Sequence, residues 1–164
     1  MVNDNENEQK AQVVRENLDY LVRFAFFRTG HRELAEDLVH DAVVRFIEHR
    51  HPPVMPENMR AYLFRIVYNL CQESANGNRR CISIDEIDVT LDETEEERLD
   101  MEEAERINSI LDAIPERQAE IVRMDVVDGL SFVESSRILS VPASTLKSRF
   151  KAGMDKLKQM YFNK

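Results

Sequence analysis

The chain has 164 residues, enough for one ordinary domain or two small ones of roughly 60–80 residues each. Its 43% hydrophobic and 32% charged residues indicate a globular protein with a strongly charged surface, and four glycines with no tryptophan favour helices over sheets. No stretch comes close to the run of about 18 apolar residues that a membrane-spanning helix needs. The first residues, MVNDNENEQK, also lack the pattern of a signal peptide. We therefore expect a cytoplasmic protein without membrane insertion.

The first half of the sequence predicts three helices. Apolar residues at three- and four-residue intervals indicate helices over 8–28, 33–48 and 59–75. Thr29-Gly30 separates the first two, and three prolines in residues 49–58, HRHPPVMPEN, separate the second from the third. We expect these helices to form an N-terminal domain over residues 8–80. Its inward-facing residues are predicted to include Val14, Leu18, Leu21, Val22, Leu34, Leu38, Ala42, Phe46, Ile47, Tyr62, Leu63, Ile66 and Leu70.

An acidic segment follows the third helix. Residues 82–106 contain twelve acidic residues and only two basic ones, whereas the chain from Ser131 onward has seven basic residues and two acidic ones. The net charge of −9 is therefore unevenly distributed along the chain. This asymmetry indicates that the basic C-terminal part contacts nucleic acid and that the acidic segment has a different role. The sequence predicts an acidic linker over residues 81–105, and a plain solvated linker explains the charge equally well.

The C-terminal part, residues 106–162, is predicted to form four helices. Apolar periodicity resumes at Ile107, and Pro115 suits the first turn of a helix that runs down to Asp128-Gly129. Ser131 followed by Glu134 forms a capping box before a short helix. A turn over residues 140–142 then leads into a final helix that reaches about residue 160. The expected fold is all-α: two small helical domains, the second ending in a helix-turn-helix.

In a helix-turn-helix, the second helix enters the major groove and presents its N-terminal half to the bases. The residues predicted to do so here are Ala143, Ser144, Thr145, Lys147, Ser148, Arg149 and Lys151. The three cations would neutralise about three phosphates, which is too few for tight independent binding, so affinity could come from a larger partner. The alternative is a helical hairpin that merely has a basic rim.

The sequence offers little support for an enzyme. It contains no glycine-rich phosphate loop, and no His, Asp, Ser or Cys residues converge as a catalytic set. Cys71 and Cys81 are too sparse for a disulfide scaffold, and a metal site would need to recruit His49 and His51 from a loop. We therefore predict reduced thiols, no catalytic residues, no metal site and no cofactor.

Two stretches together resemble a known family. Residues 111–157, LDAIPERQAEIVRMDVVDGLSFVESSRILSVPASTLKSRFKAGMDKL, resemble the C-terminal promoter-binding domain of bacterial RNA polymerase sigma factors of the extracytoplasmic-function group. Residues 35–49, AEDLVHDAVVRFIEH, and residues 60–70, RAYLFRIVYNL, resemble the N-terminal domain of the same group. The chain departs from the pattern at Ser140, where the family usually has a turn glycine, and at Tyr62, where it commonly has tryptophan.

The resemblance implies a role for each domain in promoter recognition, DNA melting and transcription initiation. The second helix would bind the clamp helices of core RNA polymerase through Asp37, His40, Asp41, Arg45 and Glu48, although an ordinary solvated face has the same pattern. The −10 element would be opened and held by Asn58, Arg60, Arg65, Tyr68, Asn69, Gln72, Arg79 and Arg80. The helix-turn-helix would read the −35 element of promoter DNA, and the linker would follow channels that RNA later occupies.

The resemblance also implies an anti-sigma factor that clamps the two domains together. Two other functions remain open at this level. One is a sigma-like decoy that sequesters an anti-sigma factor without binding promoters, and the other is a stand-alone helix-turn-helix regulator. A decoy would be expected to lose its DNA-reading cations, whereas Lys147, Arg149, Arg79 and Arg80 are present.

Overall fold

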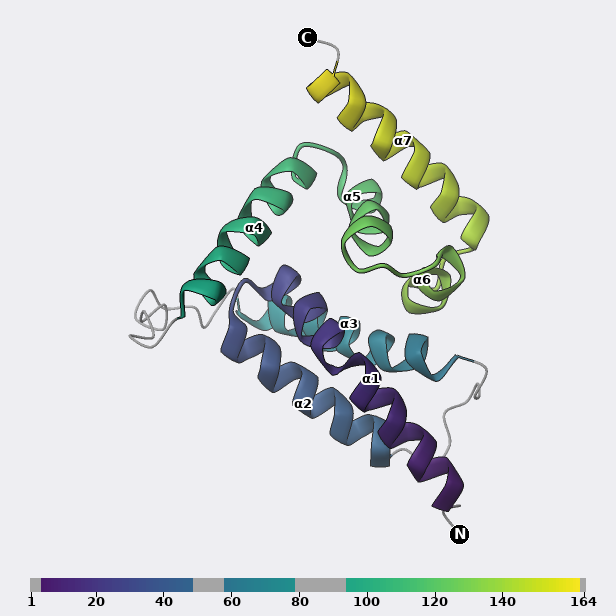
Figure 1. The fold of residues 1–164 in the computed structure, drawn as a ribbon. Helices are drawn as coiled ribbons and strands as arrows, with labels where there is room; N and C mark the ends of the chain where they lie inside the picture. The colour runs from purple at the N-terminus through teal and green to yellow at the C-terminus, as the bar shows by residue number, and fades with distance from the viewer. Residues whose placement is uncertain (1–3, 49–57, 79–93, 163–164) are drawn as a thin grey trace.

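The computed structural model describes residues 4–48, 58–78 and 94–162. These ranges form seven α-helices and one π-helical segment, with no strand, so the predicted all-α class is confirmed (Figure 1). The elements are α1 (Asp4–Thr29), α2 (Arg32–Glu48), α3 (Met59–Asn78), α4 (Glu95–Leu111), α5 (Glu116–Val122), η2 (Arg123–Val127), α6 (Phe132–Leu139) and α7 (Ala143–Phe162).

Helices α1, α2 and α3 pack against one another as the first helical group. Gly30 joins α1 to α2 at a φ of +74°, a left-handed conformation that suits glycine, and its N–H donates to the carbonyl of Phe26. At the centre, the rings of Phe24 and Phe64 meet edge to face with centroids 5.2 Å apart. The predicted α1 stripe was wrong at Leu18, which is 44% exposed, because the buried face of α1 centres on Leu21, Phe24 and Ala25.

Similarly, α2 buries Ala35, Val39, Ala42 and Phe46, while Ile47 is 44% exposed rather than inward-facing. Leu34 and Leu38 are only half-buried. The core-facing stripe of α2 is therefore narrower than predicted. Small residues at 35 and 42 allow the helix to approach its neighbours closely.

Helix α4 includes residues 95–105, which the sequence assigned to the acidic linker, and the limits of that linker stay a prediction. Thr94 and Glu97 form a capping box at the start of α4. The negative charges of Glu95, Glu96 and Glu97 in the first turn also interact favourably with the positive end of the helix dipole. Ala104 of α4 is buried, and the Asn108 amide donates to the carbonyl of Phe27 at 3.0 Å. Apolar periodicity missed this start because the first turns are almost entirely charged. Residues 81–93 of the predicted linker lie outside the described ranges.

The second helical group comprises α4 to α7 with η2. Leu111, Ile114, Ala119 and Val122 form a small cluster, covered by Phe150, Met154 and Leu157 of α7. Gly153 allows α7 to approach closely, since a Cβ there would lie 3.1 Å from a methyl carbon of Val122. The side of α7 that carries Phe150, Met154 and Leu157 thus faces the second helical group.

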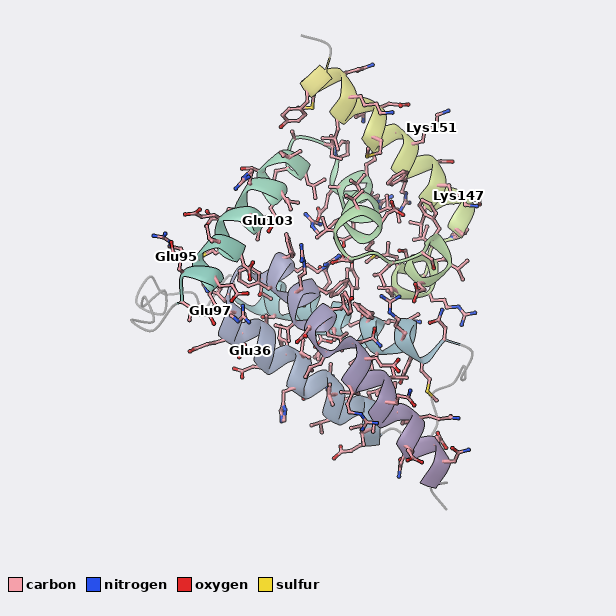
Figure 2. The ribbon with its side chains drawn as sticks, in the orientation of Figure 1. Glu36, Glu95, Glu97, Glu103, Lys147 and Lys151 are labelled. Atoms are coloured by element: carbon pink, nitrogen blue, oxygen red, sulfur yellow. The ribbon has the colours of Figure 1, made fainter. Side chains whose placement is uncertain are left out.

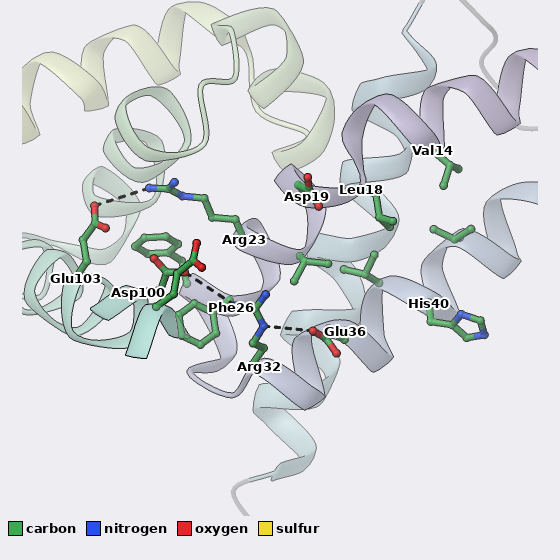
Figure 3. A pocket seen from close by; sticks show the side chains of 15 residues that line it. Val14, Leu18, Asp19, Arg23, Phe26, Arg32, Glu36, His40, Asp100 and Glu103 are labelled. Carbon is green, nitrogen blue, oxygen red and sulfur yellow. Dashed lines mark hydrogen bonds and ion pairs between the residues drawn. The ribbon is translucent and has the colours of Figure 1, made fainter. Parts of the chain in front are cut away.

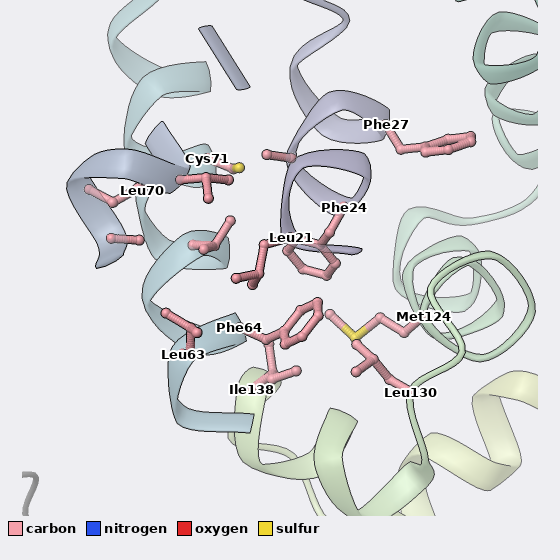
Figure 4. Packing of buried hydrophobic residues seen from close by; sticks show 14 of the residues in the cluster. Leu21, Phe24, Phe27, Leu63, Phe64, Leu70, Cys71, Met124, Leu130 and Ile138 are labelled. Carbon is pink, nitrogen blue, oxygen red and sulfur yellow. The ribbon is translucent and has the colours of Figure 1, made fainter. Parts of the chain in front are cut away.

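The two helical groups share one core rather than standing apart. Phe24 and Phe64 of the first group cluster with Met124, Leu130 and Ile138 of the second (Figure 4). All five side chains are at most 2% exposed. The sequence predicted two bodies joined by a linker and did not indicate this packing. The predicted domain limits of 8–80 and 106–162 remain a prediction.

Ser140 is expected to be a mild strain point in the helix-turn-helix. Its φ of 57° and ψ of 43° are left-handed, a conformation that costs a non-glycine residue roughly 1–2 kcal/mol. Glycine would relieve this cost, but it loses more conformational entropy on folding, and that loss offsets about half of the relief. Ser140→Gly should therefore raise the free energy of unfolding by about 0.5–1 kcal/mol in urea titrations. An unchanged or lower stability would show that the serine is not strained.

Cys71 should make the fold sensitive to alkali. Burial raises the pKa of its thiol from the ordinary 9.0 to about 11. Because the folded state favours the protonated thiol, the stability that the buried neutral thiol contributes is complete below pH 9. It is lost as the pH rises through about 11. The free energy of unfolding should fall by roughly 2 kcal/mol between these values. Cys71→Ala should flatten that slope, and an identical slope in the variant would contradict the assignment.

Candidate nucleic-acid interface

The helix-turn-helix is built by local capping and a tight turn. Ser131 Oγ accepts from the N–H of Glu134 at 3.0 Å, and Glu134 accepts from the N–H of Ser131 at 3.2 Å. The turn is closed by Ser136, whose hydroxyl donates to the carbonyl of Val141 at 2.6 Å. Phe132 and Phe150 then pack edge to face across the two helices. The sequence prediction of this motif agrees with the described geometry.

The predicted base-reading residues lie on the first turns of α7. Ser144, Lys147, Ser148 and Lys151 are exposed, and Ala143, Thr145 and Arg149 are half-buried. Figure 2 shows Lys147 and Lys151 on the outer side of α7. Among the described residues, no carboxylate forms an ion pair with either lysine. Both are therefore available to a phosphate backbone.

The structure places the predicted −10 residues in different surroundings. Arg65, Asn69 and Gln72 are exposed on α3 at spacings of four and three, which places them on one helix face. Asn58 instead caps α3, because its side-chain oxygen accepts from the N–H of Ala61 at 3.0 Å. Arg79 and Arg80 lie outside the described residues.

Arg60 contacts the second helical group although its side chain is 32% exposed, and Tyr68 is half-buried. The Arg60 guanidinium donates to both carboxylate oxygens of Glu134 at 2.9 and 2.8 Å, and its Nε donates to Asn17. Burial raises the pKa of Tyr68, and the nearby carboxylate of Glu120 raises it further. Arg60 thus contacts the chain itself at a position predicted to contact DNA.

A buried charge network, absent from the sequence predictions, joins the two helical groups. Arg28 at the end of α1 donates to Glu120 at 2.6 Å and to Asp128 at 3.0 Å. Its side chain is only 6% exposed and lies 3.6 Å from the ring centroid of Phe24. Arg123 also donates to Glu120 and continues the network to Asn108.

The electrostatics of this network follow from burial and pairing. Burial by itself would lower the pKa of Arg28, but Glu120 and Asp128 reverse that effect and raise it above its ordinary value. Burial raises the pKa of Asp128, and Arg28 opposes that rise. Arg28 and Arg123 together supply two positive charges to the two carboxylates of Glu120 and Asp128. The sequence predictions assigned no role to Arg28.

The predicted polymerase-binding residues lie on the outer face of α2. Asp37, His40, Asp41, Arg45 and Glu48 are all exposed, and Arg45 and Asp41 form an ion pair at 3.4 Å. The structure therefore places all five on the surface, as their spacing indicated. Binding of core polymerase by these five residues stays a prediction.

Next to this face, α1, α2 and α4 enclose a groove of about 800 Å³ (Figure 3). Its apolar lining includes Val14, Leu18 and Val39, and His40 lies at its edge. Arg32 pairs with Glu36 at 3.3 Å and with Glu97 of α4 at 3.6 Å. These ion pairs are exposed, so each contributes little to stability.

The described residues hold neither a membrane span nor a metal centre. Within residues 4–48, 58–78 and 94–162, every helix is too short or too polar to cross a bilayer. In these ranges no three His, Cys, Asp or Glu side chains gather as ligands of an ion.

Comparison with known proteins gives concordant matches along the chain. Residues 13–81 match the family model of sigma-70 region 2, and residues 104–157 match that of sigma-70 region 4. The chain is 25% identical over 142 residues to the ECF RNA polymerase sigma factor EcfG of Rhodopseudomonas palustris (strain TIE-1), covering 85% of this chain and 77% of that protein.

Solved structures with a similar fold include CnrH in complex with the cytosolic domain of CnrY. That likeness has a TM-score of 0.66 at 20% identity and covers 92% of this chain and 86% of CnrH. Another is the sigma factor RpoE in complex with the anti-sigma factor NepR from Bartonella quintana. Its TM-score is 0.58 at 20% identity, covering 88% of this chain and 93% of that one.

Proposed function

Since this chain belongs to the extracytoplasmic-function group of the sigma-70 family, whose members are non-enzymatic transcription factors, we propose that it directs bacterial core RNA polymerase to specific promoters. The observation that carries the proposal is the outer face of α7. There, Lys147 and Lys151 are exposed on the second helix of a well-capped helix-turn-helix, and no carboxylate of the described residues forms an ion pair with either. This is the arrangement that reads a major groove and holds its phosphates.

By the same proposal, helix α3 binds the −10 element of the promoter. Arg65, Asn69 and Gln72 present one cation and two amide groups on an exposed face. Amides and arginines bind the base edges and backbone of an opened single strand, which offsets the cost of unstacking its bases. Asn58 supports this surface indirectly, because it caps the helix that carries it.

Core polymerase is the proposed partner of α2. Asp37, His40, Asp41, Arg45 and Glu48 are all exposed. Helix α2, which carries them, lies apart from α6 and α7 (Figure 1). Polymerase could then be bound while α7 contacts DNA. We place this activity in the cytoplasm, where the polymerase acts.

An anti-sigma factor is the proposed negative regulator, since a solved relative of similar fold, RpoE, is bound to one. The decoy alternative is disfavoured by the unpaired lysines of α7. A decoy that only bound an anti-sigma factor would not need cations aimed at a groove.

Run-off transcription with purified core polymerase and a promoter library tests the proposal. We expect start sites that appear only when this chain is added. Lys147→Gln with Lys151→Gln should weaken promoter binding and reduce the slope of log affinity against log salt by about 2. Lys158→Gln, which removes an exposed cation further along α7, is the matched control. Absence of any added start site with the unmodified chain would overturn the proposal.

A further inference from the structure

We propose that the chain associates with a second copy of itself, with the C-terminal end of α7 of one copy docked in the groove between α1, α2 and α4 of the other. The proposal goes beyond the promoter function, because it uses neither the exposed face of α3 nor the first turns of α7. Two surfaces carry it. One is an apolar groove with an acidic rim, and the other is a basic helix end with an uncovered apolar stripe.

The floor of the groove is formed by apolar side chains from two helices. Val14, Leu18 and Val22 follow one another at four-residue intervals along α1, and Val39 and Val43 do the same along α2. Leu18 remains 44% exposed at the centre of the α1 row (Figure 3). Two such rows accept the side chains of a third helix whose apolar residues recur at three- and four-residue intervals.

The rim of the groove is acidic. Five of the residues that line the groove are acidic and two are basic. Both basic residues, Arg23 and Arg32, already pair with carboxylates of the groove, at 3.9 and 3.3 Å. Among the described residues, no cation forms an ion pair with Asp19 or Glu96. The rim therefore carries negative charge that a cationic helix would neutralise.

The C-terminal end of α7 has the opposite character. Its core-facing stripe continues from Leu157 to Met160 and Tyr161, which are 40% and 50% exposed. Figure 1 shows why these two side chains are exposed, since α7 extends past α5 toward the C-terminus. Lys156 and Lys158 are exposed on either side of the stripe. The end of α7 is thus a basic amphipathic helix without a partner for its apolar side in the part of the chain that the structure describes.

The groove and the end of α7 match in spacing and in charge. Leu157, Met160 and Tyr161 lie at intervals of three and four residues, which is the pattern of a helix that docks in an apolar groove. Lysines beside this stripe would stand opposite the carboxylates of the rim. Since α7 ends on the side of the molecule away from α1 and α2, it cannot reach the groove of its own chain (Figure 1). The contact must therefore join two copies.

This contact joins two different surfaces, so each pair of chains leaves one groove and one α7 end uncovered. Further copies can then add to the pair or close a ring. A single helix end makes a small interface, and we expect a Kd on the order of 100 µM. Below about 10 µM the chain is then mainly a monomer, so stability and size measured there are those of a single chain.

Two substitutions each disable one surface. Leu18→Lys interrupts the apolar floor and repels the lysines of α7, whereas Met160→Glu interrupts the stripe and is repelled by the acidic rim. Both sites are partly exposed, so the variants should fold, which circular dichroism checks. The matched controls make similar charge changes elsewhere. They are Val133→Lys at a 56% exposed site of α6 and Gln159→Glu on the side of α7 away from the stripe.

Sedimentation velocity of the full chain measures the association, with a reducing agent present to exclude disulfide-linked dimers. Between about 5 and 500 µM, the average mass of the unmodified chain and of both controls should rise with concentration. Leu18→Lys and Met160→Glu should each weaken association about ten-fold or more. Raising the salt concentration from about 50 to 500 mM should weaken association of the unmodified chain, because the rim and the lysines are exposed.

Mixing the two disabled variants is the sharpest test. Leu18→Lys keeps an intact α7 end and Met160→Glu keeps an intact groove, so an equimolar mixture has one working contact. The mixture should form a one-to-one dimer and nothing larger, although neither variant associates alone. A mixture that stays monomeric while the unmodified chain associates would show that the two surfaces do not meet, and would overturn the proposal.

Two other results would also overturn it. One is association of Leu18→Lys or Met160→Glu alone as strong as that of the controls. The other is an unmodified chain that stays monomeric at about 500 µM, which would leave the groove to a helix of another protein. None of these outcomes depends on promoter selection, because the measurements contain neither polymerase nor DNA.

Discussion

Replacing Arg28 with methionine should lower the free energy of unfolding by about 3–5 kcal/mol, because the buried carboxylate of Asp128 loses its ion-pair partner and Glu120 keeps only Arg123. Glu120 and Asp128 both direct oxygen atoms at the Arg28 guanidinium, at 2.6 and 3.0 Å. Methionine fills part of the space over Phe24 but can neither donate a hydrogen bond nor carry charge. Urea titration of the full chain, followed by circular dichroism, measures the loss.

Arg15→Met is the matched control for this prediction. Arg15 is an exposed residue of the same helix, so its replacement should change stability by less than about 0.5 kcal/mol. Adding Asp128→Asn to Arg28→Met should cost less than the sum of the two single changes, because the asparagine removes a charge that has lost its partner. Additive effects, or a loss below about 1 kcal/mol for Arg28→Met, would contradict a stabilising role.

Phe64→Ala should be comparably destabilising, by about 3–5 kcal/mol, because it leaves a cavity in a fully packed site. Phe64 is completely buried and its ring meets that of Phe24 at 5.2 Å. It also lies where Met124, Leu130 and Ile138 enter the shared core (Figure 4). The variant should therefore lose stability and also loosen the contact between the two helical groups.

Thermal and urea unfolding of Phe64→Ala measure the first effect, and small-angle X-ray scattering measures the second as a larger radius of gyration. Tyr161→Ala removes a half-exposed aromatic ring from the end of α7 and should change neither quantity appreciably. A Phe64→Ala protein that is less stable yet equally compact would show that Phe64 supports the first helical group alone. The shared core would then not depend on this ring.

Features that depend on neighbouring residues were predicted correctly from the sequence. The capping box of Ser131 and Glu134, the turn before α7 and the exposure of Lys147 and Lys151 all follow from spacings of a few residues. The same holds for the exposed face of α2, whose residues recur every three or four positions. Helical periodicity is a local property, so it indicates which side of each helix meets solvent.

Where local signals were weak, the predictions failed. The charged first turns of α4 hide its apolar periodicity, so the sequence predicted no helix before residue 107, although Thr94 and Glu97 cap α4. Leu18 was expected inside because it is apolar, yet it borders the groove against α2. In both cases, hydrophobicity was a poorer guide than capping or helix packing.

The sequence by itself determined the all-α class, the helix-turn-helix and the cations on its outer face. Only the tertiary structure decided that Arg28 and Arg60 bind carboxylates instead of solvent, since their partners lie 92, 100 and 74 positions away. The physical reason is range. Caps and amphipathic stripes act within a turn or two of the chain, whereas a buried ion pair depends on how whole helices pack, which no local spacing records.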